Sequence, residues 1–208
     1  MLQTGAVEPA TLSLLKDLLS IDELQEFYLV GGTALALKFD HRKSIDLDLF
    51  TTGSPDMTLL RKVLERKFGN SFEGENREIK FRVFCSIHSV KVDIVNIPQE
   101  MIRKPELIDG IRMYSNEDIA AMKINALLDR GQKKDFYDVC ELLKIFTLGE
   151  IIAFYREKYS DQHLLISIPS AITYFSEAEE SPDPVSLNGT TWENVQEKLK
   201  EEVRNFLR

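Results

Sequence analysis

Three aspartates in two apolar, strand-like runs are the strongest candidates for a reactive site. Asp46 and Asp48 lie two residues apart in residues 44–50, and Asp93 lies in residues 90–95. Residues i and i+2 of a strand project from one face, so the first two carboxylates can reach one or two divalent cations. A third carboxylate among apolar neighbours is costly unless it meets a metal or a base. Three carboxylates on adjacent strands outline a two-metal site.

A glycine turn one helix upstream of these acids points to phosphate chemistry. Gly31 and Gly32 follow an apolar run and precede Thr33. A strand, a glycine turn and a helix together direct backbone N–H groups at an anion, and the Thr33 hydroxyl can add a donor. Asp-X-Asp alone is more often a solvated surface pair, and Gly-Gly alone is usually a turn. Their order, with twelve residues between Thr33 and Asp46 to house a helix, favours in-line displacement at phosphorus.

Alternating strand-like and helical patterns must position these residues. Strands are expected at residues 27–30, 44–50, 79–87 and 90–95, with an edge hairpin at 108–113. Helices are expected at residues 9–19, 33–39 and 59–68, and a loop at 69–76. Thr33 is expected to begin or cap its helix, and Ile45 is expected on the same side of its strand as Leu47 and Leu49.

After Ser115 the pattern becomes helical throughout. Helices are expected from about residue 116, at residues 133–146, 148–159 and 191–207. The sequence therefore predicts an α+β protein, with a mixed β-sheet flanked by helices followed by a helical C-terminal part. We place the domain boundary between residues 1–114 and 115–208.

Composition excludes several classes of protein. The 208 residues include 26 Lys and Arg against 34 Asp and Glu, and the net charge of −8 has the wrong sign for coating nucleic acid. Residues 177–202 hold eight of the acids and two of the bases, so the acidity belongs mainly to this segment. The two cysteines cannot form a disulfide framework. With no signal peptide or membrane span expected, the predicted location is the cytoplasm.

The chain resembles the nucleotidyltransferase superfamily and, within it, the AbiEii/AbiGii toxin family. The resemblance rests on the segments VGGTALAL, HRKSIDLDLF, VKVDIV and EDIAAMKINALLDRGQKKDFYDVCELL, and covers most of residues 28–145. The superfamily's Gly-Ser is Gly32-Thr33 here, and threonine keeps the hydroxyl. The resemblance implies a nucleotidyltransferase-like fold for the N-terminal part.

The same resemblance implies roles for particular residues. Asp46, Asp48 and Asp93 become catalytic ligands of Mg²⁺ or Mn²⁺, and Asp93 becomes the base for the incoming hydroxyl. The expected nucleotide-binding residues are Gly31, Gly32, Thr33, Arg42, Ser44, Lys123 and Asp135. The alternative interpretations are a polar loop for residues 42–44 and a solvated helix–helix corner for the charged residues at 123–138. His41, His88 and His163 are expected on the surface or in turns.

Two classes of function remain in competition. The first is an enzyme that moves a nucleoside monophosphate, or less favourably pyrophosphate or phosphate, from an NTP to a hydroxyl. The resemblance implies an acceptor that is an RNA 3′ end such as tRNA, or a protein, and a toxin role with an antitoxin partner. The second is a non-catalytic relative that binds a nucleotide or a partner. Metal-dependent nucleases and glycosyltransferases also use Asp-X-Asp, but the glycine turn favours a triphosphate.

Overall fold

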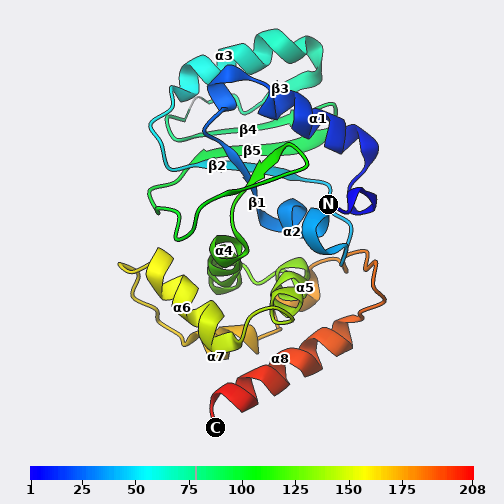
Figure 1. Cartoon of the computed structure of the whole chain (residues 1–208), viewed down its shortest axis with the longest axis vertical. Helices are drawn as coiled ribbons and strands as arrows, with labels where there is room; N and C mark the ends of the chain where they lie inside the picture. Colours follow the sequence, from blue (N-terminus) through cyan, green and yellow to red (C-terminus); the bar gives the residue numbers. More distant parts are fainter. Residues whose placement is uncertain (78) are drawn as a thin grey trace.

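A mixed β-sheet and a bundle of helices form the two parts of the chain (Figure 1). The computed structural model describes residues 1–77 and 79–208. In that part of the chain, seven strands form one sheet in the order β3-β4-β5-β2-β1-β7-β6. The strands are β1 (Tyr28–Val30), β2 (Leu47–Thr51), β3 (Phe72–Gly74), β4 (Arg82–Ile87), β5 (Val90–Asn96), β6 (Glu106–Ile108) and β7 (Ile111–Met113).

Parallel and antiparallel pairs alternate at the centre of the sheet. β2 runs antiparallel to β1 and parallel to β5, and β1 runs parallel to β7. β4 and β5 form a hairpin whose turn residues, His88 and Ser89, both have positive φ. The edge hairpin of β6 and β7 turns at Asp109 and Gly110, as the sequence predicts. The predicted α+β class, with a mixed sheet, is confirmed.

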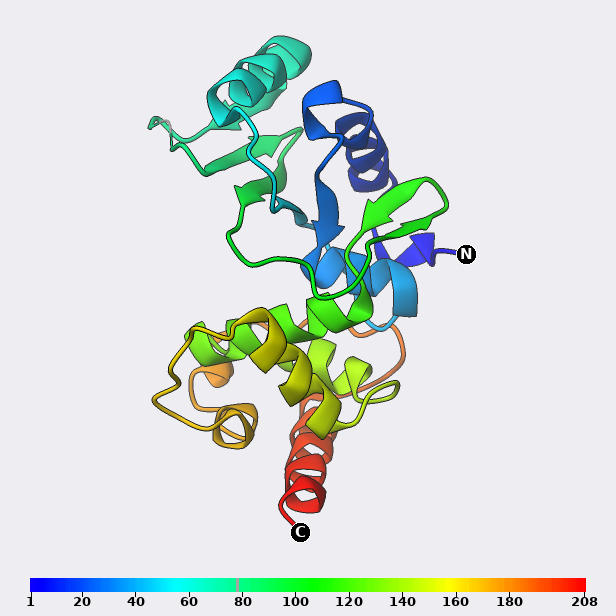
Figure 2. The same ribbon diagram turned by 60° about the vertical axis from the view of Figure 1, so that its left-hand side comes forward.

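Within the described residues, three α-helices accompany the sheet and five follow it. The first group is α1 (Pro9–Leu19), α2 (Gly31–Phe39) and α3 (Met57–Phe68). The second is α4 (Asn116–Asp129), α5 (Lys133–Leu142), α6 (Leu148–Lys158), α7 (Ile168–Ile172) and α8 (Trp192–Phe206). α2 lies between the sheet and the helical part and contacts both α4 and α5 (Figure 1). α8 lies at the opposite end of the molecule from α3 (Figure 2).

Local chemistry explains where the later helices begin. The Ser115 side chain accepts a hydrogen bond from Asp118 N at the start of α4, and Thr191 with Asn194 forms a capping box at the start of α8. The last strand that the structure describes ends at Met113 and helices follow it, so the predicted helical C-terminal part is confirmed. The division into two domains stays a prediction.

Three local predictions are wrong. α2 begins at Gly31, with Val30 as its N-cap, because Gly31 adopts a positive φ that turns the chain directly from strand into helix. The predicted loop at 69–76 contains β3, which pairs with β4. β2 begins only at Leu47, because Arg42 and Ser44 form bridges with other segments, and Ile45 is 65% exposed whereas Leu47 and Leu49 are buried.

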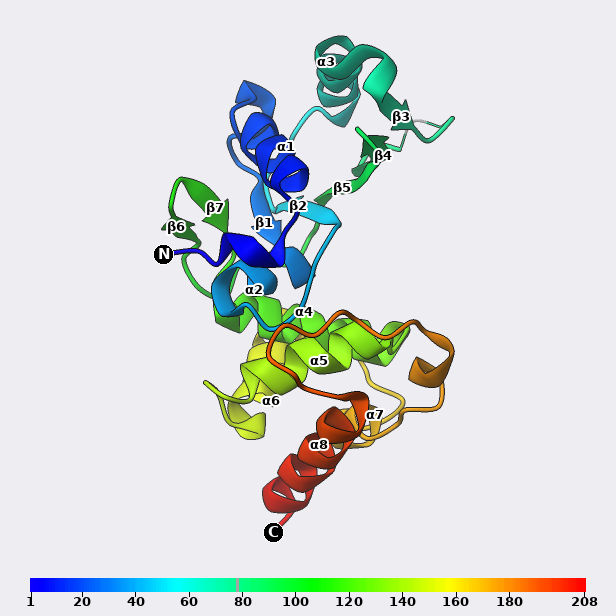
Figure 3. The same ribbon diagram turned by 90° about the vertical axis from the view of Figure 1, so that its right-hand side faces the viewer.

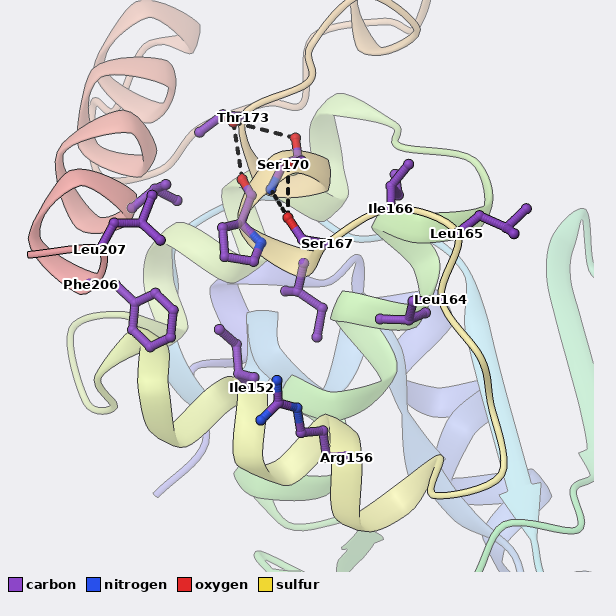
Figure 4. A pocket seen from close by; sticks show the side chains of 13 residues that line it. Ile152, Arg156, Leu164, Leu165, Ile166, Ser167, Ser170, Thr173, Phe206 and Leu207 are labelled. Atoms are coloured by element: carbon purple, nitrogen blue, oxygen red, sulfur yellow. Dashed lines mark hydrogen bonds between the residues drawn. The ribbon is translucent and has the colours of Figure 1, made fainter.

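A cavity outside the candidate site has a lining that includes none of the three aspartates. It has a volume of about 680 Å³, and its lining comes from α6, α7, the chain before α7 and the end of α8 (Figure 4). Exposed apolar side chains such as Leu165 and Phe206 contribute to it.

Both cysteines are free, Cys85 buried and Cys140 partly buried. Among the described residues, no helix combines the length and apolar character needed to cross a bilayer.

Candidate active site

Asp48 and Asp93 stand side by side at the centre of the sheet. β2 and β5 are parallel in a register that pairs Asp48 with Asp93, and β1 lies on the other side of β2 with Val30 opposite Asp48. The Asp48 carboxylate packs against Gly31, where a Cβ would stand 2.7 Å from Asp48 Oδ2. Gly31 therefore serves both the turn, with its φ of +70°, and the space that Asp48 needs.

These two carboxylates, which we call the sheet pair, are short of positive charge. Burial, and secondly the charge of Asp93, raise the pKa of Asp48 to about 6, although Lys123 opposes the shift. One oxygen of Asp93 accepts from Lys91 Nζ at 2.7 Å. The other, Oδ1, is buried without a hydrogen-bond partner among the described residues. An unsatisfied carboxylate oxygen beside a second carboxylate suits a divalent cation.

Asp46 lies one residue before β2 and lines the same cavity as Asp48. Its Oδ2 is 3.6 Å from Lys134 Nζ, and its main-chain carbonyl accepts a hydrogen bond from the Thr33 hydroxyl. In residues 1–77 and 79–208, no group of three or more His, Cys, Asp or Glu side chains is placed to hold one metal ion. The sheet pair thus fits a cation as it stands, whereas Asp46 as a third ligand stays a prediction.

The Thr33 and Ser44 hydroxyls hold the segment that carries Asp46. They lie 2.8 Å apart, and both residues are buried. Because Thr33 also donates to the Asp46 carbonyl, it fastens α2 to the chain just before β2. The predicted contacts of these two hydroxyls with phosphate stay predictions.

A second acidic group, Asp135 and Asp138 of α5, lies between α2, α4 and α5, and we call it the helix pair. Arg42 binds Asp138 through two hydrogen bonds, Nε–Oδ1 at 2.7 Å and Nη2–Oδ2 at 2.8 Å. Lys123 Nζ lies 2.6 Å from Asp138 and 2.9 Å from Asp135. Burial alone would raise the pKa of Asp138, but Arg42 and Lys123 hold it well below its usual range. This cluster is buried and fully paired at Asp138.

The helix pair corrects one sequence interpretation and adds a residue to the site. His41 is 2% exposed, not on the surface, because its Nε2 lies 2.7 Å from Asp138 Oδ1. The sequence places Asp138 in the charged stretch at residues 123–138 but does not mark it as a site residue. Asp135 and Asp138 are three residues apart, which puts both carboxylates on one face of the helix. This spacing indicates that Asp138 belongs with Asp135.

One cavity of about 290 Å³ gathers most of the predicted residues. Its lining includes Gly32, Arg42, Ser44, Asp46, Asp48 and Lys123. Arg130 and Lys134 add cationic side chains that are more exposed than Lys123. A Cβ at Gly32 would overlap the Arg42 guanidinium, so glycine is required there too. Gly31, Asp93 and Asp135 contact lining residues.

A segment of the acidic C-terminal region closes one side of this cavity. We call residues 181–187 the strap. Lys133 fixes its start, since Lys133 N donates to Ser181 Oγ at 2.9 Å and Lys133 Nζ lies 2.9 Å from Asp183 Oδ1. Lys43 N donates to the Val185 carbonyl at 2.8 Å and fixes its far end. The orange strap passes α5 toward α2 before the chain turns into α8 (Figure 3).

Comparison with known proteins gives the same fold in two solved structures. JHP933 from Helicobacter pylori has a TM-score of 0.57 at 18% identity, over 96% of this chain and 92% of its own. MenT4, a nucleotidyltransferase toxin from Mycobacterium tuberculosis H37Rv, has a TM-score of 0.59 at 14% identity, over 92% and 82%. At such identities the likeness shows the fold, which is nucleotidyltransferase-like as predicted.

Sequence comparison extends over nearly the whole chain. An uncharacterized protein of Aquifex aeolicus (strain VF5) is 27% identical over 199 residues, 93% of this chain and 94% of the relative. A family model described as "Nucleotidyl transferase AbiEii toxin, Type IV TA system" matches residues 13–208. The chain therefore belongs to the AbiEii nucleotidyltransferase toxin family.

Proposed function

We propose that this protein is a Mg²⁺- or Mn²⁺-dependent enzyme that transfers a nucleoside monophosphate from an NTP to a hydroxyl group. The observation that supports this most is the sheet pair, two adjacent carboxylates that Lys91 neutralises only in part, beside a cavity lined with cations. A bound divalent cation would neutralise charge on the triphosphate and favour ionisation of the attacking hydroxyl. Asp48 and Asp93 would hold it, with Asp46 as an additional ligand.

The remaining residues have roles that follow from their positions. The N-terminus of α2 offers backbone N–H groups to phosphate oxygens, and Lys123, Arg130 and Lys134 offer positive charge from the other side of the cavity. The acceptor oxygen forms a bond to the α-phosphorus while the bond to pyrophosphate breaks, and Asp93 takes the hydroxyl proton.

The helix pair positions Lys123 and takes no direct part in the reaction. Asp135 and Asp138 hold the Lys123 ammonium from two sides, so Lys123 keeps one orientation beside Asp48. Arg42 is engaged by the same Asp138. Its contact with phosphate is part of the proposal, as are the contacts of Thr33 and Ser44.

The direct test is transfer of label from each α-labelled NTP, with Mg²⁺ or Mn²⁺, to total tRNA or to cell lysate. We expect label in RNA or protein with the wild type, and none with Asp48→Ala. Asp17→Ala, which removes an exposed carboxylate on α1, is the matched control and should retain transfer. Absence of transfer from every NTP, with metal affinity unchanged in Asp46→Ala and Asp48→Ala, would leave the non-catalytic alternative.

The family description supports a toxin role, with an antitoxin as the biological partner. On this proposal, induced expression of the wild type arrests bacterial growth and Asp48→Ala does not. Equal growth inhibition by the wild type and by Asp48→Ala would show that toxicity does not depend on the sheet pair.

A further inference from the structure

Two large apolar side chains are exposed in the cavity that holds the charged site. Ile45 is 65% exposed and Val185 is 64% exposed, and both line the cavity together with Asp46 and Asp48. Their exposure leaves apolar surface in contact with water. Burial of this surface against a ligand would contribute favourably to the free energy of binding. They lie at the same cavity as Lys123 and Lys134, which the triphosphate needs.

The strap holds Val185 in place through several independent contacts. Arg42 and Ser186 form an antiparallel bridge, which puts Val185 opposite Lys43, two residues before Ile45. Leu187 N donates to the His41 carbonyl at 3.0 Å on the other side of that bridge. Pro184 and Pro182 restrict the backbone between these contacts and the Lys133 anchor. The apolar wall is therefore preorganised.

We propose that Ile45 and the strap residues Val185 and Pro184 form the slot for the nucleobase of the NTP. This inference rests on the proposed function, because the triphosphate must occupy the charged part of the same cavity. A nucleotide has an anionic end and a flat base with apolar faces, and the cavity presents cations at Lys123 and Lys134 and apolar side chains at the slot.

The dimensions of the cavity favour a single nucleotide as the occupant. Its volume of about 290 Å³ is near the lower end for small-molecule sites. Such a volume suits a single nucleoside.

The test compares the affinity of the full-length protein for NTPs and for inorganic tripolyphosphate, measured by calorimetry with Mg²⁺. The wild type should bind at least one NTP more tightly than tripolyphosphate. Ile45→Ser and Val185→Ser should each weaken binding of that NTP roughly fivefold to tenfold and leave tripolyphosphate affinity unchanged. Leu107→Ser is the matched control, because Leu107 is 71% exposed on the distant edge strand β6.

The possible outcomes separate this inference from the proposed function. If tripolyphosphate binds and both serine variants keep wild-type NTP affinity, the slot is wrong while the triphosphate site stands. If the variants only raise the KM for the acceptor, the slot serves the acceptor and the inference is overturned. If neither NTP nor tripolyphosphate binds, both proposals fall. Circular dichroism should show unchanged folding, since both side chains are mostly exposed.

Discussion

The sheet pair and the helix pair are two sets of aspartates in one small region with opposite electrostatic environments. In the helix pair, Asp138 has Arg42, Lys123 and His41 around it, and its pKa is held well below the usual range. In the sheet pair, burial raises the pKa of Asp48 to about 6, and one oxygen of Asp93 lacks a partner among the described residues. Asp135 Oδ2 of the helix pair also lacks a hydrogen-bond partner among the described residues, so the pairs differ in the cations beside them: Arg42 and Lys123 at the helix pair, Lys91 at the sheet pair.

This difference separates a structural cluster from a reactive one. Burial disfavours ionisation at both sites, so the nearby charges decide the direction of the pKa shift. Lys123 links the two, because it binds both members of the helix pair and its charge acts on Asp48. A change in one pair should therefore affect the other through this lysine.

The largest effect is expected from breaking the helix pair. Asp138→Ala leaves Arg42 and Lys123 as buried cations without one of their main partners, and should cost about 3–5 kcal/mol in the free energy of unfolding. Urea denaturation measures this. Asp129→Ala, at an exposed position of α4, is the control and should change stability little. A loss below about 1 kcal/mol for Asp138→Ala would mean that the cluster is not a structural core.

Acid should unfold the protein partly through the same residue. The pKa of Asp138 is lower in the folded than in the unfolded state, so its stabilisation is present above the unfolded value of about 3.9. That contribution is lost as pH falls through the lower, folded-state pKa. Stability of the wild type should decline in this acid range, and Asp138→Asn should show a smaller decline. Parallel pH curves for the two proteins would contradict this.

Removing the Asp48 charge from the sheet pair should raise the stability of the metal-free protein, whereas removing Asp138 lowers stability. The folded-state pKa of Asp48 is about 6, above its unfolded value, so ionising Asp48 costs stability as pH rises toward and past 6. Asp48→Asn should therefore stabilise the metal-free protein at pH 8, by up to about 3 kcal/mol, and make no difference below pH 4. Melting temperatures at the two pH values in a chelator check this. Destabilisation at pH 8 would show that the chain already neutralises Asp48.

The smallest effect on stability is expected at the exposed cation next to Asp46. Lys134 lies 3.6 Å from Asp46 at a partly exposed position, so Lys134→Gln should change stability by less than about 1 kcal/mol. If Lys134 contacts the triphosphate, the same variant should raise the KM for NTP at least severalfold. Lys62→Gln, on α3, is a control that should alter neither. An unchanged KM would place Lys134 outside the nucleotide site.

Local patterns predict the strands that carry the sheet pair, but not the contacts between segments that are distant in the sequence. Alternation identifies the strands that carry Asp48 and Asp93, and the glycine turn follows directly from Gly31. The role of His41 depends on Asp138, which is 97 residues away, so no local pattern reveals it. Likewise the strap reaches the site only because Lys43 and Lys133 bind it, and Ile45 lies outside β2 because its neighbours pair elsewhere.

The central claim is that the chain neutralises the sheet pair only in part, through Lys91, so that the pair can bind a divalent cation. Mn²⁺ binding, followed by electron paramagnetic resonance, tests this most directly in the wild type, Asp93→Asn and Asp135→Asn. We predict that Asp93→Asn weakens Mn²⁺ binding at least tenfold, whereas Asp135→Asn, if folded by circular dichroism, retains it. Equal binding by the wild type and Asp93→Asn would contradict the account.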